Sequence, residues 1–136
     1  MVMTTTTKPM LDAYPQEIEL DRGRLAEVID TLNDCAEACT SCADACLSEP
    51  MVAELITCIR TNLDCADICG TTARVLSRHT GDDVRVTRGM LEACATACAA
   101  CAAECAQHSD MEHCRICAEA CRTCEHACRE LIAAMG

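Results

Sequence analysis

The sequence predicts an all-α fold, an antiparallel up-down-up-down four-helix bundle with a cysteine-lined interior. After residue 20 the chain divides into four segments of similar length, which are rich in strong helix formers and separated by short helix-breaking sequences. Within each segment the cysteines recur at intervals of three, four or seven residues, the period of the face that a bundle helix turns inward. Short connections between helices of similar length favour antiparallel neighbours.

The first part of the chain differs from the rest. Residues 1–20 show no clear periodicity and contain Pro9 and Pro15, so we expect an N-terminal tail or a loosely packed lead-in. Residues 21–136 are expected to form one four-helix domain, and a total of 136 residues suits a single domain.

Three connections separate the expected helices. The first ends at Pro50, which suits the first position of the second helix because that position needs no backbone N–H. The second contains Gly81 as a left-handed helix stop, followed by Asp82 as the cap of the third helix. In the third connection, Ser109 and Glu112 have the spacing of a capping box at the start of the fourth helix.

All sixteen cysteines fall on these helices with charged residues between them, so we expect the cysteine stripes to point inward. The first helix carries Cys35, Cys39, Cys42 and Cys46, and the second carries Cys58, Cys65 and Cys69. The third carries Cys94, Cys98, Cys101 and Cys105, and the fourth carries Cys114, Cys117, Cys121, Cys124 and Cys128. Antiparallel packing would stack the stripes into tiers, one of Cys46, Cys58, Cys105 and Cys114 and another of Cys35, Cys69, Cys94 and Cys128. Asn62 interrupts the stripe of the second helix.

Charge and hydropathy exclude several classes of partner. The net charge of −11 argues against nucleic-acid binding, because phosphates would be repelled. We expect no membrane partner, since no apolar run approaches the roughly 20 residues of a transmembrane helix. The first residues lack the apolar stretch of a secretory signal. We therefore expect a cytoplasmic protein, in a compartment that keeps thiols reduced.

The core must be built from small side chains, because the sequence contains no Phe, no Trp and one Tyr. Leucine, isoleucine and phenylalanine normally supply most of the buried area. An interior of alanine and thiols needs another source of cohesion. Bound metal would supply it, since ligation that occurs only in the folded state adds directly to stability.

Other interpretations of the cysteines fit less well. One or two buried cysteines can be small apolar filler, but sixteen in register argue against that role. Cysteines three or four apart on a helix have β-carbons roughly 5–6 Å apart, whereas a disulfide needs about 3.8 Å. The ferredoxin-type cysteine run is missing. A thiol-redox enzyme is not indicated either, because no cysteine is marked as a low-pKa nucleophile, and we predict no catalytic residues.

Thiolate-only surroundings select soft metals such as Cu(I), zinc and cadmium. A zinc site with four thiolates carries a net charge of about −2, and several such sites in a narrow interior would be costly to desolvate. Cu(I) accepts two or three thiolates, and one Cu(I) per cysteine leaves the interior neutral. These arguments favour Cu(I). A zinc- or cadmium-binding, metallothionein-like detoxification protein is the alternative.

One end of the predicted bundle collects softer, weaker ligands. The connections after the first and third helices meet there and bring together Met51, His108, Met111 and His113. Thioether and imidazole can bind Cu(I) weakly and pass it inward, so we expect this end to be the mouth of the bundle. The alternative is that they are ordinary residues at helix ends. At the opposite end we expect an apolar plug of Val28, Leu32, Leu76, Val86, Met90, Leu131 and Met135.

Over about residues 24–134 the sequence resembles the cytosolic branch of the bacterial copper storage proteins, the Csp family. The resemblance lies in the motif C-x3-C-x2-C-x3-C, which begins at Cys35 on the first helix and again at Cys94 on the third. It implies a cytosolic store and buffer for Cu(I), with many ions per chain held by the cysteines inside the bundle. It also implies a homotetramer, whose partners are copper ions and a copper donor or acceptor.

Overall fold

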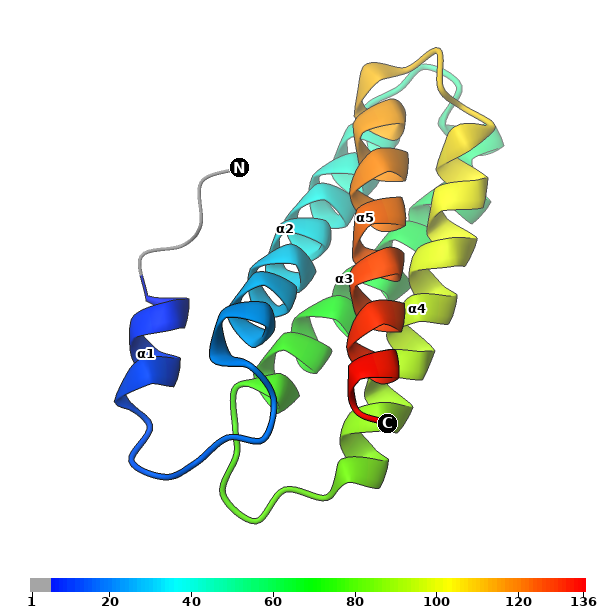
Figure 1. The fold of residues 1–136 in the computed structure, drawn as a ribbon. Helices are drawn as coiled ribbons and strands as arrows, with labels where there is room; N and C mark the ends of the chain where they lie inside the picture. The colour runs from blue at the N-terminus through cyan, green and yellow to red at the C-terminus, as the bar shows by residue number, and fades with distance from the viewer. Residues whose placement is uncertain (1–5) are drawn as a thin grey trace.

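A computed structural model describes residues 6–136 of the chain (Figure 1). Its elements are α1 (Thr7–Ala13), α2 (Arg22–Leu47), the 3-10 helix η1 (Val52–Leu55), α3 (Ile56–Leu76), α4 (Val84–Ala106) and α5 (Glu112–Ala134). Helices α2 to α5 run alternately up and down, and each packs against two others: α2 and α4 both contact α3 and α5. The predicted four-helix bundle is confirmed.

Two helix starts differ from the sequence-based expectation. Pro50 does not begin the second helix, because a turn and η1 come first and α3 starts only at Ile56. The predicted capping box is wrong as well. The N–H of Met111 donates to the carbonyl of His108 at 3.0 Å, so the chain is still turning at Ser109, and α5 begins at Glu112. In both connections backbone turns extend the link between helices by several residues.

The connection between α3 and α4 follows the prediction more closely. Gly81 has φ +63°, the left-handed conformation that favours glycine. The cap of α4 is Asp83 instead of the predicted Asp82, and its carboxylate accepts a hydrogen bond from the N–H of Arg85 at 2.9 Å. The helix therefore starts one residue later than expected, at Val84.

The segment expected as a tail contains a short helix that lies against α2 (Figure 1). Leu11 of α1 is buried, and the hydroxyl of Thr7 donates to the Asp30 carboxylate on α2 at 2.6 Å. Pro9 lies in the first turn of α1, where a missing N–H does not interrupt the helix. These contacts attach the segment to the bundle, while its separation as a region distinct from residues 21–136 stays a prediction.

A layer of leucines closes the end of the bundle where α2 begins and α5 ends. Val28, Leu32, Leu76 and Leu131 of the predicted plug are buried, and Met90 and Met135 are partly buried. Val86 is 57% exposed and lies outside the plug. Two leucines that we did not predict, Leu25 and Leu91, are buried with the others. Most of the bulkiest apolar side chains of the core thus lie at this end, and Leu55 of η1 is buried near the other end.

Helix α4 departs from the expectation that no segment has membrane-spanning hydropathy. By length and composition alone, Val84–Ala106 is apolar enough to cross a membrane. Its hydropathy comes mainly from alanine and cysteine, and the face that carries Cys94 to Cys105 is buried against the other helices. A core helix of this composition passes the same test, so the feature is weak evidence for a membrane partner.

We predict that Leu32→Ala destabilises the reduced, metal-free protein by about 2–5 kcal/mol, because it leaves a cavity in the leucine layer. Leu63→Ala is the matched control, since Leu63 is 46% exposed and its truncation should change stability by less than about 0.5 kcal/mol. Urea unfolding followed by circular dichroism measures both. Equal losses in the two variants would contradict the assignment of the plug.

Candidate metal centre

The interior of the bundle is a column of sixteen thiols. Every cysteine is at most 1% exposed, and all sixteen lie within the described residues as free cysteines. They project from all four long helices because the three- and four-residue spacing keeps each stripe on the inward face. The predicted cysteine-lined interior is confirmed.

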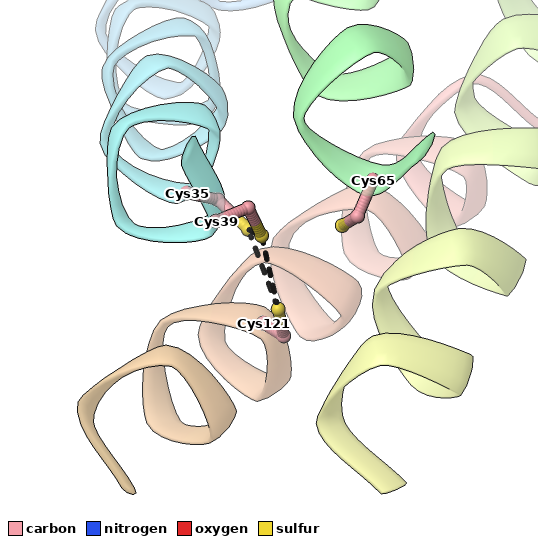
Figure 2. A group of neighbouring side chains, drawn as sticks. All are labelled: Cys35, Cys39, Cys65 and Cys121. Atoms are coloured by element: carbon pink, nitrogen blue, oxygen red, sulfur yellow. Dashed lines mark hydrogen bonds between the residues drawn. The ribbon is translucent and has the colours of Figure 1, made fainter. Parts of the chain in front are cut away.

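Neighbouring sulfurs lie at non-bonded distances from one another. Cys39 Sγ is 3.6 Å from Cys121 Sγ, and Cys35 Sγ is 3.8 Å from the same atom. Figure 2 shows these side chains together with Cys65. The four side chains extend from α2, α3 and α5 toward one another, with all sulfurs within 4.8 Å. Across the column the hydrogen-bonded sulfurs are separated by 3.6 Å, as between Cys69 and Cys94, to 4.0 Å, as between Cys35 and Cys39.

This spacing fits a soft metal ion. A thiolate–metal bond of about 2.3 Å, as found for zinc, places three sulfurs in a plane about 4.0 Å apart and four at tetrahedral corners about 3.8 Å apart. The sulfurs of the column are already close to these separations, whereas a disulfide requires about 2.05 Å. Metal ions can therefore enter between the sulfurs with little movement of the helices.

The sulfur groups overlap. Groups whose ligand atoms all lie within 4.8 Å of one another include Cys35, Cys39, Cys65 and Cys121; Cys35, Cys65, Cys69 and Cys98; Cys39, Cys101, Cys117 and Cys121; and Cys69, Cys94, Cys98 and Cys124. Cys35 and Cys65 belong to two of these groups, and so does Cys39. A shared thiolate has to bridge two ions. The arrangement therefore suits a continuous metal–thiolate cluster better than separate four-thiolate sites.

The contacts within the first predicted tier agree with the expectation, and the second tier holds in part. Near the turn after α2, Cys46 lies 3.9 Å from Cys114, and Cys58 lies 3.8 Å from Cys105. In the other tier Cys69 lies 3.6 Å from Cys94 and within 4.8 Å of Cys35, as expected. On α5, however, Cys35 contacts Cys121, about two helical turns before the expected Cys128. The helices are inclined to one another (Figure 1), so a level estimated from residue counts drifts along the bundle.

Asn62 stands inside the column at the place of the missing thiol on α3. It is fully buried, and its Oδ1 accepts S–H hydrogen bonds from Cys101 at 3.0 Å, Cys117 at 3.3 Å and Cys105 at 3.4 Å. Its Nδ2 donates to Cys58 Sγ at 3.8 Å. The amide thus satisfies its own hydrogen-bonding groups while holding three thiols around one oxygen.

At the predicted mouth His113 reaches the column. Its Nδ1 lies 3.4 Å from Cys42 Sγ and 3.6 Å from Cys114 Sγ. Together with Cys46 these residues form a group with all ligand atoms within 4.8 Å. The structure therefore brings one of the predicted histidines into contact with thiols.

The other mouth residues lie at the same end in different surroundings. His108 lies in the turn after α4, and its Nε2 is 3.1 Å from Oε2 of Glu104 in the last turn of that helix. Met51 is 40% exposed in the turn before η1. Met111 is partly buried against the core as the N-cap of α5. Sequence reasoning missed Glu49, which pairs with His113 at 2.8 Å. Because the pair is 64 positions apart, no local pattern indicates it.

Comparison with known proteins identifies the family. The sequence profile of the Csp family, described as copper storage protein, matches residues 21–133. The chain belongs to the copper storage protein family. The structure of Ccsp from Streptomyces lividans loaded with 10 copper equivalents has a TM-score of 0.91 and 60% sequence identity, over 93% of this chain and 98% of that one.

Two proteins of lower sequence identity also match this chain over most of their own length. The Cu(I)-bound copper storage protein BsCsp3 has a TM-score of 0.71 at 36% identity, over 79% of this chain and 96% of its own. The uncharacterized cysteine-rich protein YhjQ of Bacillus subtilis (strain 168) is 37% identical over 92 residues, which are 68% of this chain and 81% of that protein. The predicted family and the predicted function, copper storage, are confirmed, and the zinc or cadmium alternative is not favoured.

The thiols of a copper storage protein must lose protons as copper binds, and burial opposes that loss. Burial raises the pKa of the Cys114 thiol to about 12 and also raises the pKa of Cys46. Deeper in the column the thiols are unequal: hydrogen bonds with Cys105 and Cys42 lower the pKa of Cys58. Hydrogen bonds with Cys101 and Cys117 raise the pKa of Cys105. Without a cation the column therefore keeps most of its protons.

We predict that the reduced, metal-free protein loses stability in alkaline solution. An unfolded thiol ionises near pH 8.5, whereas the folded pKa of Cys114 is about 12. A raised folded pKa contributes stability that is full below about pH 8.5 and is lost as pH rises toward 12. The urea midpoint should fall across this interval, and Cys114→Ser should show a smaller fall. A midpoint that stays constant from about pH 8 to 11 would contradict the raised pKa values.

Proposed function

We propose that this chain stores and buffers Cu(I) in the cytosol by binding about one cuprous ion per cysteine in the thiol column. The observation that carries the proposal is the overlap of the four-sulfur groups, which share cysteines such as Cys35 and Cys39. Shared thiolates bridge Cu(I) ions and give a cluster that runs along the bundle. The role is non-enzymatic, since the cysteines act as ligands only.

Charge balance supports Cu(I) at this stoichiometry. Each Cu(I) replaces one thiol proton, so a column with one ion per cysteine carries no net charge. Zinc bound by four thiolates would leave about −2 at every site, inside an interior where every sulfur is buried. The free thiols suit the cytosol, where cysteines stay reduced, and the Streptomyces lividans relative is described as cytosolic.

The proposed ligands form two sets. The storage ligands are Cys35, Cys39, Cys42, Cys46, Cys58, Cys65, Cys69, Cys94, Cys98, Cys101, Cys105, Cys114, Cys117, Cys121, Cys124 and Cys128. The mouth residues are Met51, His108, Met111 and His113, and the contacts of His113 with two thiols give it the leading role among them.

The remaining partners are proposed from the family and from the surface. We expect a homotetramer, as in the family resemblance, and exposed apolar side chains such as Ile56, Leu63 and Ile116 offer surfaces for subunit contact. A copper donor or acceptor would meet the mouth. We expect no nucleic-acid partner because the net charge is −11, and no membrane partner because the cysteine face of α4 is committed to the bundle.

We predict that the reduced protein saturates at about one Cu(I) per cysteine in an anaerobic titration followed by metal analysis after a competing chelator. Zinc should bind at a lower ratio and be displaced by Cu(I), because thiolates prefer the softer ion. Saturation near four Cu(I) per chain would contradict the proposal and would indicate separate sites.

We predict that His113→Ala slows Cu(I) uptake, measured by stopped flow from a coloured Cu(I)–chelator complex, and leaves most of the capacity intact. His108→Ala should have a smaller effect, because its ring pairs with Glu104 instead of a thiol. His126→Ala is the matched control, since the His126 side chain is exposed and pairs with Glu130 on the surface of α5. Identical uptake rates in all three variants and the wild type would contradict the assignment of these histidines to a mouth through which copper enters.

A further inference from the structure

We propose that Glu49 is a positioning residue that holds His113 with its Nδ1 facing the first thiols of the column. This inference rests on the proposed function and specifies how the mouth is organised. Glu49 itself does not contact the sulfurs. It acts through the imidazole, by fixing both the direction of the ring and the nitrogen that carries the proton.

The geometry of the imidazole divides its two nitrogens between two partners. Nε2 lies 2.8 Å from Glu49 Oε2, while Nδ1 lies 3.4 Å from Cys42 Sγ and 3.6 Å from Cys114 Sγ. A carboxylate oxygen accepts the hydrogen bond that Nε2–H donates, so this contact favours the tautomer that carries its proton on Nε2. The lone pair of Nδ1 then points at the sulfurs, which is the form of histidine that binds a metal.

The backbone of Glu49 is held at the end of α2. The N–H of Glu49 donates to the carbonyl of Cys46 at 3.2 Å, and the carbonyl of Glu49 accepts from the N–H of Val52 at 3.2 Å. These backbone bonds attach Glu49 to the helix that carries Cys42 and Cys46, whereas His113 is on α5. The pair therefore connects the two helices whose cysteines form the group around His113.

This pair differs from the other histidine–glutamate pairs among residues 6–136. His108, in the turn that follows α4, pairs with Glu104, and His126 pairs with Glu130 on α5; each partner is four residues away in the sequence. Such spacing brings side chains together on any helix surface. Glu49 and His113 are 64 positions apart, and both side chains are about three-quarters buried at 26% and 25% exposure. The pair is part of the mouth's structure rather than of a helix surface.

The consequence concerns the incoming ion. The group of Cys42, Cys46, His113 and Cys114 contains an imidazole, in contrast to the all-cysteine groups around Cys35, Cys39 and Cys69. A ring already turned toward the sulfurs, with its proton on Nε2, offers the lone pair of Nδ1 directly to an arriving Cu(I) ion. Loss of Glu49 lets the ring rotate and change tautomer, so fewer molecules present this ligand at the moment of encounter.

Three substitutions separate positioning from charge attraction. Glu49→Gln keeps the length of the side chain and an oxygen that can accept from Nε2–H. Glu49→Asp keeps the charge but is shorter by one methylene and withdraws the oxygen from the ring. Glu49→Ala removes both. Glu130→Gln is the control, because it makes the same charge change beside His126 on the surface.

Positioning predicts uptake rates in the order wild type, Glu49→Gln, then Glu49→Asp and Glu49→Ala together, with the slowest about 10-fold below wild type. The control should match wild type. Stopped-flow transfer from a coloured Cu(I)–chelator complex measures all five proteins. If Glu49→Asp is as fast as wild type while Glu49→Gln is slow, and raised salt removes the difference, the carboxylate only attracts the cation and the proposal is overturned.

A second readout does not involve copper. In the reduced, metal-free protein, ¹⁵N chemical shifts of the His113 ring, assigned with His113→Ala, should report the Nε2–H tautomer. In Glu49→Ala they should report a mixture of tautomers, with Glu49→Gln close to wild type. The same shifts in Glu49→Ala and wild type, or an Nδ1–H ring in wild type, would overturn the proposal.

The design distinguishes failure of this inference from failure of the proposed function. Saturating Cu(I) capacity is measured on every variant, and all should match wild type because Glu49 is not a storage ligand. A low capacity in wild type itself would reject the proposed function. Full capacity together with equal rates in every Glu49 variant would reject only the positioning role.

Discussion

Sixteen thiols packed into one buried column are the constraint on which the rest of the structure depends. Thiols make few strong contacts with one another, and burial opposes their ionisation, as the raised pKa of Cys114 shows. The column is stable as a neutral assembly, with protons or with monovalent metal. Either state lets four helices approach closely around small side chains. Asn62 is a buried polar side chain within the column. Three S–H hydrogen bonds to its oxygen offset the free-energy cost of burying the amide.

The bulky apolar side chains complement this column instead of lining it. Five leucines are buried at one end of the bundle: Leu25, Leu32, Leu76, Leu91 and Leu131. There they make more dispersion contacts than the smaller side chains of cysteine and alanine can make. The opposite end buries Leu55 of η1 and also presents imidazole, thioether and carboxylate groups. One end of the bundle is therefore closed by apolar packing, and the other end is where metal ions exchange with solvent.

Much of this organisation was predictable from the sequence because it is set by periodicity. The spacing of the cysteines determines which face each helix buries, and Gly81 marks a turn by its own conformational freedom. What depends on contacts between distant segments was not predictable. Examples are the docking of α1 through Leu11 and Asp30 and the pairing of Glu49 with His113. The start of α3 at Ile56 and the exposure of Val86 were missed for local reasons, the turns before α3 and the cap of α4 at Asp83.

The asymmetry of the bundle has a kinetic consequence under the proposed function. Because the leucine layer blocks one end of the bundle, ions both enter and exit at the other end, past His113. The deepest cysteines, such as Cys94 and Cys128, must then be filled through the sulfurs above them, which share ligands from group to group. Exchange between overlapping thiolate groups allows this movement, because an ion can acquire a new sulfur before it releases an old one. A column of separate closed sites would not allow this movement of ions. The overlap of the sulfur groups thus explains storage capacity and access through one mouth by the same geometry.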